Sequence, residues 1–302
     1  MLLKLSSLAT LGFCATLVLG QCTSDNKLLR KEWRQLTSTE QQEYIAAEQC
    51  LQSLPSKTGL PGVVTRFDDM QAIHQIQSEI IHNVGQFLAF HRLYVRVHEE
   101  LLREECGYTG AQPWWNETMD DGHYIDSPLF KPDAFGGNGA SDTGCVVDGP
   151  FANYTLHLGP GHDITDHCLT RHINNALGAG SFFVEKALNA TNYSDMDTFM
   201  VKVPGPHPAG HSAVGGEMAN PTSSPGDPIF FLHHAWIDRI WSTWQARDPS
   251  TRLTAISGYT TTSSPFVPTT LDYELNLFGI RPNATIRDVM DISGDRICVE
   301  YS

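Results

Sequence analysis

Basic side chains are scarce in this sequence. Its 302 residues include 20 Lys and Arg against 34 Asp and Glu, which gives a formal net charge of −14. A surface of this sign repels the phosphate groups of nucleic acids and of anionic lipids. We therefore expect neither a nucleic acid nor a membrane among the partners, while the oligomeric state stays open.

Long hydrophobic runs are also missing, apart from one near the start of the chain. Residues 8–19 are largely apolar, but about a dozen residues fall short of the roughly 20 that span a bilayer. A basic residue precedes the run, and Val18 and Gly20 stand at the −3 and −1 positions of a cleavage site, as in a secretory signal peptide. The sequence thus predicts a signal peptide over residues 1–20 and a secreted protein of residues 21–302.

No Cys-x-x-Cys pair of the kind used in metal and redox motifs is present. The cysteines beyond the predicted signal peptide are even in number, which favours disulfide bonds formed in an oxidising compartment. The sequence alone fixes no pairing among them. They are Cys22, Cys50, Cys106, Cys145, Cys168 and Cys298.

Asn-x-Ser/Thr sequons also fit an exported protein, because this tripeptide is the acceptor for N-glycosylation. Two of the sequons lie three residues apart, which is too close for both to be glycosylated. We predict glycosylation among Asn116, Asn153, Asn189, Asn192 and Asn283.

The chain has neither a repeat of solenoid period nor a low-complexity linker, so a single domain over residues 21–302 is expected. Gly, Pro, Asp and Asn between residues 107 and 166 predict a long irregular segment, and short alternating runs near the C-terminus predict a β-hairpin or extended structure. Apolar residues at helical spacing make the fold mainly α. The first predicted helix covers residues 24–54 and has overlapping capping boxes at 37–42. A second is predicted to begin at Asp68, which caps it together with Gln71. Further helices are predicted over residues 85–105, 166–189, 207–218 and 227–247.

Histidine is abundant, with 13 copies, and it is the commonest metal ligand in proteins. One set of histidines comprises His74, His82 and His91. A second set comprises His207, His211 and one of His233 or His234. Residues 207 and 211 are four apart, so a helix places both rings on one face. By contrast, His98 lies two turns beyond the first set and is predicted to be a surface residue.

A phenylalanine precedes a histidine by one turn on each of the two long helices. Phe87 stands before His91, and Phe230 stands before His234. Such a ring packs on the imidazole, fixes its rotamer and keeps water off a metal. Two helix pairs that each supply three neutral nitrogens describe a four-helix-bundle core holding two metal ions, with long loops and a few short strands around it.

The residues between the ligands bear on the identity of the metal. Imidazole ligation without carboxylate or thiolate suits copper or zinc. Zinc hydrolysis requires a general base beside the ligands, as in His-Glu-x-x-His. Residues 207–211 read His-Pro-Ala-Gly-His and contain no Glu. The sequence therefore favours two copper ions.

Two longer motifs carry a family resemblance. The spacing His74-x7-His82-x8-His91 is followed by Glu-Glu-Cys-Gly-Tyr at 104–108 and Pro-Trp-Trp-Asn at 113–116. The second motif reads Gly-Pro-His-Pro-Ala-Gly-His at 205–211 and Asp-Pro-Ile-Phe-Phe-Leu-His-His-Ala-Trp-Ile-Asp-Arg-Ile-Trp at 227–241. They resemble the two copper sites of the tyrosinase and catechol oxidase family of type-3 binuclear copper proteins. The chain is most similar to short secreted fungal members of that family.

The resemblance implies an enzyme that holds two copper ions, uses O2 as co-substrate and acts on a small phenol, with no catalytic residue beyond the copper ligands. In the family the second histidine of the adjacent pair is the ligand. Relatives also bring both ends of the core together, which implies the pairs Cys22–Cys298, Cys50–Cys106 and Cys145–Cys168. The implied copper ligands are His74, His82, His91, His207, His211 and His234.

Two residues near these ligands bear on the chemistry. Asp238 lies one turn after His234 and is predicted to support it; the alternative is a charge paired with Arg239 or with solvent. Pro208 follows His207 at a position where relatives that hydroxylate monophenols often carry Asn, which with a Glu orders a water able to deprotonate the phenol.

Pro208 favours oxidation of o-diphenols or o-aminophenols to o-quinones or quinone imines. A full tyrosinase with monophenol hydroxylase activity is the alternative. A further alternative is a haemocyanin-like O2-binding protein with the same six histidines. Because all six ligand positions are filled, a copper-free homologue is not favoured.

Overall fold

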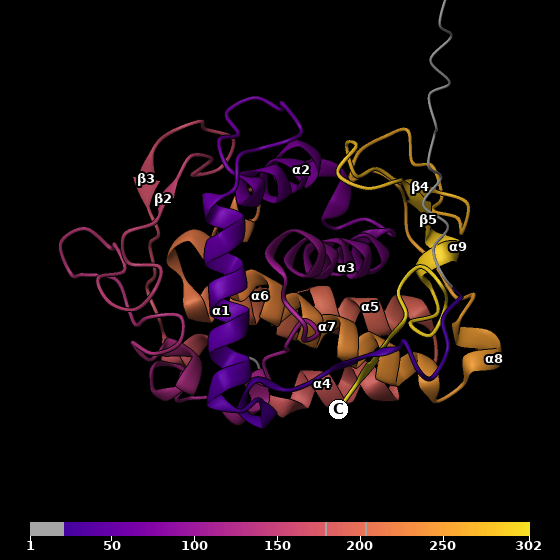
Figure 1. The fold of residues 1–302 in the computed structure, drawn as a ribbon. Helices are drawn as coiled ribbons and strands as arrows, with labels where there is room; N and C mark the ends of the chain where they lie inside the picture. Colours follow the sequence, from indigo (N-terminus) through magenta and orange to yellow (C-terminus); the bar gives the residue numbers. More distant parts are fainter. Residues whose placement is uncertain (1–20, 179, 203) are drawn as a thin grey trace, which may run out of the picture.

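Helices form the centre of the molecule (Figure 1). The computed structural model describes residues 21–178, 180–202 and 204–302, so the predicted signal peptide over residues 1–20 lies outside the described residues. The helices are α1 (Ser38–Ser53), α2 (Arg66–Ile81), α3 (Phe87–Cys106), α4 (Ser181–Asn189), α5 (Tyr193–Val201), α6 (Pro206–Val214), α7 (Ile229–Ala246), α8 (Pro249–Arg252) and α9 (Ile286–Val289).

The histidine-bearing helices pack against one another. Helix α3 contacts α2 on one side and α7 on the other, and α6 packs on α7. Their apolar side chains belong to one hydrophobic cluster. The predicted fold class is therefore confirmed: the protein is mainly α, with a bundle of α2, α3, α6 and α7 at its core, long loops and a few short strands.

The strands are short and pair in twos. β2 (Thr155–Leu156) is antiparallel to β3 (His167–Cys168), and β4 (Glu274–Leu275) is antiparallel to β5 (Ala284–Thr285). β1 (Leu28–Arg30) and β6 (Val299–Tyr301) are parallel, so segments from the two ends of the described chain lie side by side. The predicted hairpin or extended structure near the C-terminus is found in β4 and β5.

The N-terminal helix is shorter than the sequence predicts. The predicted helix spans residues 24–54, but α1 begins only at Ser38. Thr37 caps it in a capping box with Glu40, one of the predicted registers. The preceding residues form β1 because they pair with β6, a partner some 270 residues away that no local pattern reveals.

Two other helix boundaries also differ from prediction. Thr65, and not Asp68, is the N-cap of α2, and Asp68 is its capping-box partner three residues on. Of the helix predicted over residues 166–189, the described residues form a short 3-10 helix (Asn175–Leu177) and α4, whereas His167 and Cys168 form β3, which pairs with β2. The irregular segment between residues 107 and 166 is confirmed, with only short 3-10 turns and β2 within it.

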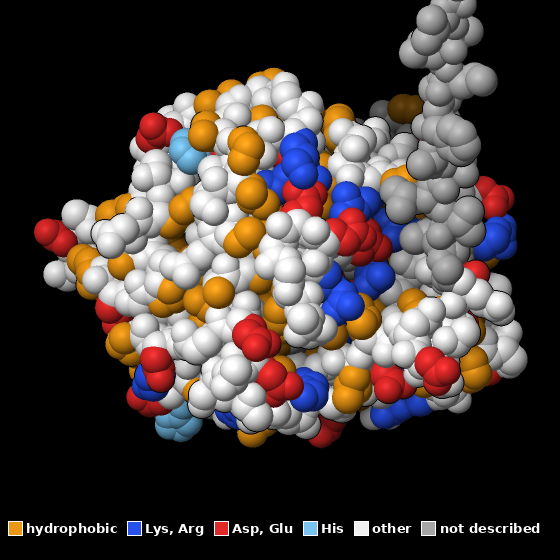
Figure 2. Space-filling view, in the orientation of Figure 1, with side chains coloured by type: hydrophobic (Ala, Val, Ile, Leu, Met, Phe, Trp, Pro, Cys, Tyr) orange, Lys and Arg blue, Asp and Glu red, His pale blue; other side chains and the backbone are white. Residues whose placement is uncertain are grey.

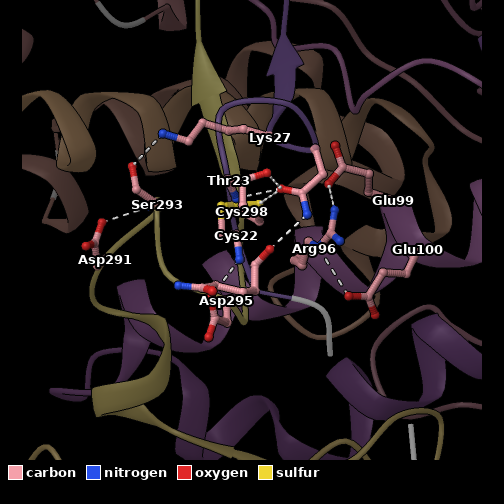
Figure 3. The surroundings of a disulfide bond; sticks show 12 residues. Cys22, Thr23, Lys27, Arg96, Glu99, Glu100, Asp291, Ser293, Asp295 and Cys298 are labelled. Atoms are coloured by element: carbon pink, nitrogen blue, oxygen red, sulfur yellow. Dashed lines mark hydrogen bonds and ion pairs between the residues drawn. A yellow bond between two sulfur atoms is a disulfide. The ribbon is translucent and has the colours of Figure 1, made fainter. Parts of the chain in front are cut away.

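Three disulfides close the loops of the chain. Cys22 is bonded to Cys298, Cys50 to Cys106, and Cys145 to Cys168, the pairing that the family resemblance implies. The first of these fastens the start of the described chain to the C-terminal segment. Beside it the backbone N–H of Cys22 donates to Asp295, as Figure 3 shows.

Charges of both signs mix on the surface. On the face in Figure 2, Lys and Arg side chains lie beside Asp and Glu. No helix among the described residues is long and apolar enough to cross a membrane. The sequon asparagines are accessible to different degrees: Asn116 is half-buried, whereas the exposed ones are Asn153, Asn189, Asn192 and Asn283.

Candidate metal centre

The first histidine set converges where α2 meets α3. His74 lies within α2, His82 follows its last residue as the C-cap, and His91 lies on the first turns of α3. Ring nitrogens of the three side chains lie within 4.8 Å of one another. The Nε2 atoms of His74 and His91 are 3.4 Å apart.

The second set joins α6 to α7. Pro206 opens α6, a position that tolerates proline because its missing N–H has no partner there in any case. His207 and His211 then lie on one helix face, as predicted. Nitrogens of these two rings and of His233 and His234 on α7 lie within 4.8 Å of one another. The Nε2 atoms of His211 and His234 are 3.3 Å apart.

The two sets face each other across the bundle. The rings of His91 and His234 are stacked, with centroids 4.4 Å apart and an interplanar angle of 12°. The rings of His82 and His207 lie 6.5 Å apart. The six predicted ligand positions, drawn from opposite halves of the sequence, therefore form one centre.

Backbone carbonyls orient most of these rings. The Nδ1–H of His74 donates to Thr222, that of His82 to Ser78, and that of His91 to Phe87, each at 2.9 Å. The Nδ1–H of His211 donates to Met218 at 2.7 Å. These hydrogen bonds fix the tautomer, so that each Nε2 keeps a lone pair directed into the centre.

Burial keeps the imidazoles neutral. It lowers the pKa of His74, and the neighbouring His82 and His91 lower it further because two positive charges repel. The same causes lower the pKa of His207 and His234. Neutral imidazoles with free lone pairs are the form that binds a metal ion.

The spacing of the nitrogens fits two metal ions. Two nitrogens bound to one ion at about 2.0–2.1 Å lie about 3.3 Å apart when the angle at the metal is roughly tetrahedral. The Nε2 pairs of His74 with His91 and of His211 with His234 have this separation. Their lone pairs repel one another unless a cation lies between them. Paired sets of neutral imidazoles in a helical bundle define a binuclear metal protein, and this donor set suits copper.

The predicted aromatic contacts are present. The ring of Phe87 lies 4.5 Å from that of His91 and 4.6 Å from that of His207. The ring of Phe230 lies 4.1 Å from that of His234. Both phenylalanines therefore pack on imidazoles and shield the centre from water.

Asp238 does not support His234 as predicted. Its Oδ1 accepts a hydrogen bond from Arg92, and its Oδ2 accepts one from the hydroxyl of Tyr301. The alternative pairing with Arg239 or solvent is not found either. Within the described chain, the Nδ1 of His234 has no hydrogen-bond partner.

His98 is buried and not at the surface as predicted. It hydrogen-bonds to Gln112 and Glu48 and stacks on Phe231 at 3.5 Å. Its partners lie outside α3, on α1, on α7 and in the loop after α3, so the helical pattern around His98 does not reveal them. It takes no part in either histidine set.

Glu117 is a residue of the site that the sequence interpretation missed. It is fully buried, and a hydrogen bond joins its Oε1 to the Nδ1 of His233. Burial raises the pKa of this carboxyl and lowers that of His233 to about 3. The only signal was its position directly after the Pro-Trp-Trp-Asn motif.

Comparisons with known proteins agree with this geometry. Residues 64–247 match the family described as the common central domain of tyrosinase. N-acetyl-6-hydroxytryptophan oxidase ivoB of Emericella nidulans is 33% identical over 98% of this chain and 99% of its own. Tyrosinase-like protein orsC of the same organism is 35% identical and covers 79% of each chain.

Solved structures show the same fold. A polyphenol oxidase variant from Thermothelomyces thermophila superposes with a TM-score of 0.87 and 32% identity, over 93% of this chain and 90% of that one. A functional unit of octopus hemocyanin, at a TM-score of 0.61 and 23% identity over 91% of this chain and 68% of that one, shares the fold alone. The chain belongs to the tyrosinase family and is a type-3 copper oxidoreductase.

Proposed function

We propose that the protein is a secreted copper oxidase that uses O2 to oxidise o-diphenols or o-aminophenols. The observation that carries this proposal is the pair of neutral histidine sets joined by the stack of His91 on His234. In the proposed reaction, two o-diphenols each lose two electrons and two protons to give o-quinones. One O2 takes up the four electrons and four protons and becomes two water molecules.

The proposed ligands divide between the two sets. Bound copper ions supply two-electron exchange with O2 and with the phenol. The chain holds the rings in place through the carbonyl contacts, and Phe87 and Phe230 exclude water around them. We assign His74, His82 and His91 to the first copper and His207, His211 and His234 to the second.

A surface cavity offers a route for the phenol. His82 is half-buried and lines a cavity of about 410 Å³ together with Asn83 and Thr262. A second cavity of about 370 Å³ shares Asn83 and Thr262 and extends to Phe266. Cavities of this size suit a small organic substrate. We infer that the phenol approaches the centre beside His82.

Pro208 favours o-diphenol oxidation over monophenol hydroxylation. It lies in the first turn of α6, next to His207, and has no polar side-chain atom that holds a water molecule. A monophenol must lose a proton of pKa near 10 before it binds a metal, and it receives no help at this position. Full tyrosinase activity remains the second candidate, which the family match supports.

A haemocyanin-like O2 carrier is less well supported. The hemocyanin unit shares the fold at 23% identity, while the relatives nearer in sequence are named as oxidases and tyrosinases. The cavity that His82 lines supports an enzyme that admits a small molecule to one of its proposed ligands.

Export is proposed from the predicted signal peptide over residues 1–20 and from the three disulfides, since disulfides persist in oxidising compartments. Secretion of the full chain from a eukaryotic host, with a mature N-terminus at Gln21, tests this part. Protein retained in the cell with residues 1–20 intact contradicts it.

The activity is tested with copper-loaded protein and three substrates: a catechol, an o-aminophenol and a monophenol. We expect O2 uptake with the first two and little or none with the monophenol. Reversible O2 binding without turnover of any substrate contradicts an oxidase and favours a carrier.

A further inference from the structure

The second histidine set contains one imidazole more than a three-ligand site requires. His233 and His234 are neighbours on α7, and nitrogens of both lie within 4.8 Å of nitrogens of His207 and His211. Consecutive residues on a helix point about 100° apart, so this proximity demands that something fixes which ring binds the metal. The sequence does not show what does so.

The two rings have different surroundings. His234 stacks on His91 of the first set, which places it between the two sets. The aromatic rings around His233 are those of His207, His211 and His234 of the second set and that of Trp236, and no ring contact joins it to His91 among the described residues. Its Nδ1 is bonded to Glu117, and its Nε2 is buried without a hydrogen-bond partner in the described chain.

Glu117 is itself held firmly. It begins the 3-10 turn Glu117–Met119. The backbone N–H of Trp115 donates to the carbonyl of Leu232, the residue before His233, at 3.2 Å. The indole N–H of Trp115 donates to Asp120 at 2.7 Å and closes the turn. The carboxyl of Glu117 is therefore presented to α7 at a fixed place.

Helix α6 packs directly on this pair. A Cβ added at Gly210 would lie 2.4 Å from Oε2 of Glu117 and 2.6 Å from Nδ1 of His233. Glycine is therefore required next to His211 for the two helices to approach each other around the pair. The Glu117–His233 pair thus lies between the two helices that carry the proposed ligands of the second copper.

We propose that Glu117 is a positioning residue of the second copper site. Its hydrogen bond holds the His233 ring away from the metal position, and its carboxyl fixes how closely α6 packs on α7. His234 then completes the ligand set with His207 and His211. This inference rests on the proposed binuclear copper site. It assigns Glu117 a role in ligand selection and none in contact with the metal.

The test measures copper binding to metal-free protein, by stoichiometry and by competition with a chelator. Glu117→Ala frees His233 and is expected to weaken the second copper by about 10- to 100-fold, the usual effect of losing a group that orients the ligands. The first copper serves as the internal reference. Glu117→Gln keeps a hydrogen-bonding partner for His233 and is expected to bind both coppers within about 3-fold of the unmodified protein.

Variants at the two histidines separate the alternatives. His233→Asn keeps a polar group for Glu117 but removes the spare nitrogen, so both coppers are expected to remain. His234→Ala is expected to lose the second copper. In the double variant Glu117→Ala with His233→Asn, the competing ring is gone, and the affinity for the second copper is expected to recover relative to Glu117→Ala alone.

Glu48→Ala is the matched control, because Glu48 is also fully buried and hydrogen-bonded to a buried histidine, His98, outside both sets. It is expected to lower the unfolding temperature of the metal-free protein without changing copper affinity. Loss of the second copper in His233→Asn would overturn the inference, because His233 would then be a ligand. Unchanged copper binding in Glu117→Ala would overturn it as well. Failure of the unmodified protein to bind two coppers refutes the proposed function instead.

Discussion

Arg92 and Asp238 form a buried ion pair that fastens α3 to α7 beside the histidine centre. The Nε–H of Arg92 donates to Oδ1 of Asp238 at 2.5 Å, and both side chains are almost completely shielded from solvent. Arg92 directly follows His91, and Asp238 lies one turn after His234. The pair therefore sets the distance between the two helices whose rings stack across the centre.

Replacing Asp238 with Ala is expected to destabilise the protein by about 3–5 kcal/mol, because it leaves the Arg92 guanidinium buried without its charge partner. Urea unfolding of the metal-free protein measures this. Asp272→Ala, which removes an exposed partner of Arg287, is the matched control and is expected to have little effect. Equal effects of the two substitutions would contradict the structural role of the buried pair.

The metal-free protein is expected to lose stability as the pH falls below about 6.5. Burial lowers the pKa of the site histidines, so the unfolded chain binds protons in this range that the folded chain does not. Each net proton changes the free energy of unfolding by about 1.4 kcal/mol per pH unit. The histidines with lowered pKa are His74, His82, His91, His207, His211, His233 and His234.

Three groups act in the opposite sense. Burial raises the pKa of Asp197 to about 7, so folding takes up a proton at this carboxyl between about pH 4 and 7. Burial also raises the pKa of Glu117 well above that of an ordinary carboxyl, which acts in the same direction. The hydrogen bond with Glu217 raises the pKa of His167, so folding also takes up a proton at this imidazole. The site histidines outnumber them, so the urea midpoint is expected to fall from pH 7.5 to pH 5.5. A midpoint that rises over this interval contradicts neutral histidines in the folded state.

Thr262→Trp is expected to raise the KM for catechol by about 10-fold, with copper content unchanged. Thr262 is exposed and lines both cavities beside His82, so a large side chain there obstructs the proposed route without disturbing the core. Ser263→Trp is the control, since Ser263 is exposed next to it and lines neither of these cavities. An unchanged KM in Thr262→Trp would show that the phenol enters elsewhere.

Pro208→Asn is expected to raise the monophenol rate relative to the diphenol rate by roughly 10-fold or more, since general-base assistance contributes about 10²- to 10⁴-fold when fully developed. The new amide holds a water molecule if a nearby carboxylate orients it. Position 208 lies in the first turn of α6, where backbone N–H groups lack helical partners, so the helix tolerates the change. Copper content is measured in parallel. Equal rates on monophenol and catechol in the unmodified protein contradict this interpretation of Pro208.

Local patterns predicted much of the fold. Helices α3 and α7 follow from apolar residues at helical spacing, and the start of α1 follows from a capping box. The pairing of β1 with β6 aligns three residues of each strand that are about 270 positions apart in the sequence, so no local signal marks it. The predicted helix over 24–54 was wrong at its start for that reason.

The histidine sets were predictable because their signals are local in the sequence. His207 and His211 share a helix face by spacing, and the motifs around them carry the family resemblance. Glu117 lies 116 residues from His233, and Asp238 bonds to Arg92 on α3 and not to His234 on its own helix. Groups that support a site from distant segments depend on tertiary packing, which periodicity along one helix does not encode.

Oxygen uptake by the copper-loaded protein with catechol, measured together with quinone formation and copper content, tests the central claim most directly. We predict two coppers per chain and two quinones formed for each O2 consumed, and no uptake in His211→Ala, which removes a proposed ligand. A protein that binds one copper or none, or that holds two coppers and consumes no O2 with catechol or an o-aminophenol, would contradict the account.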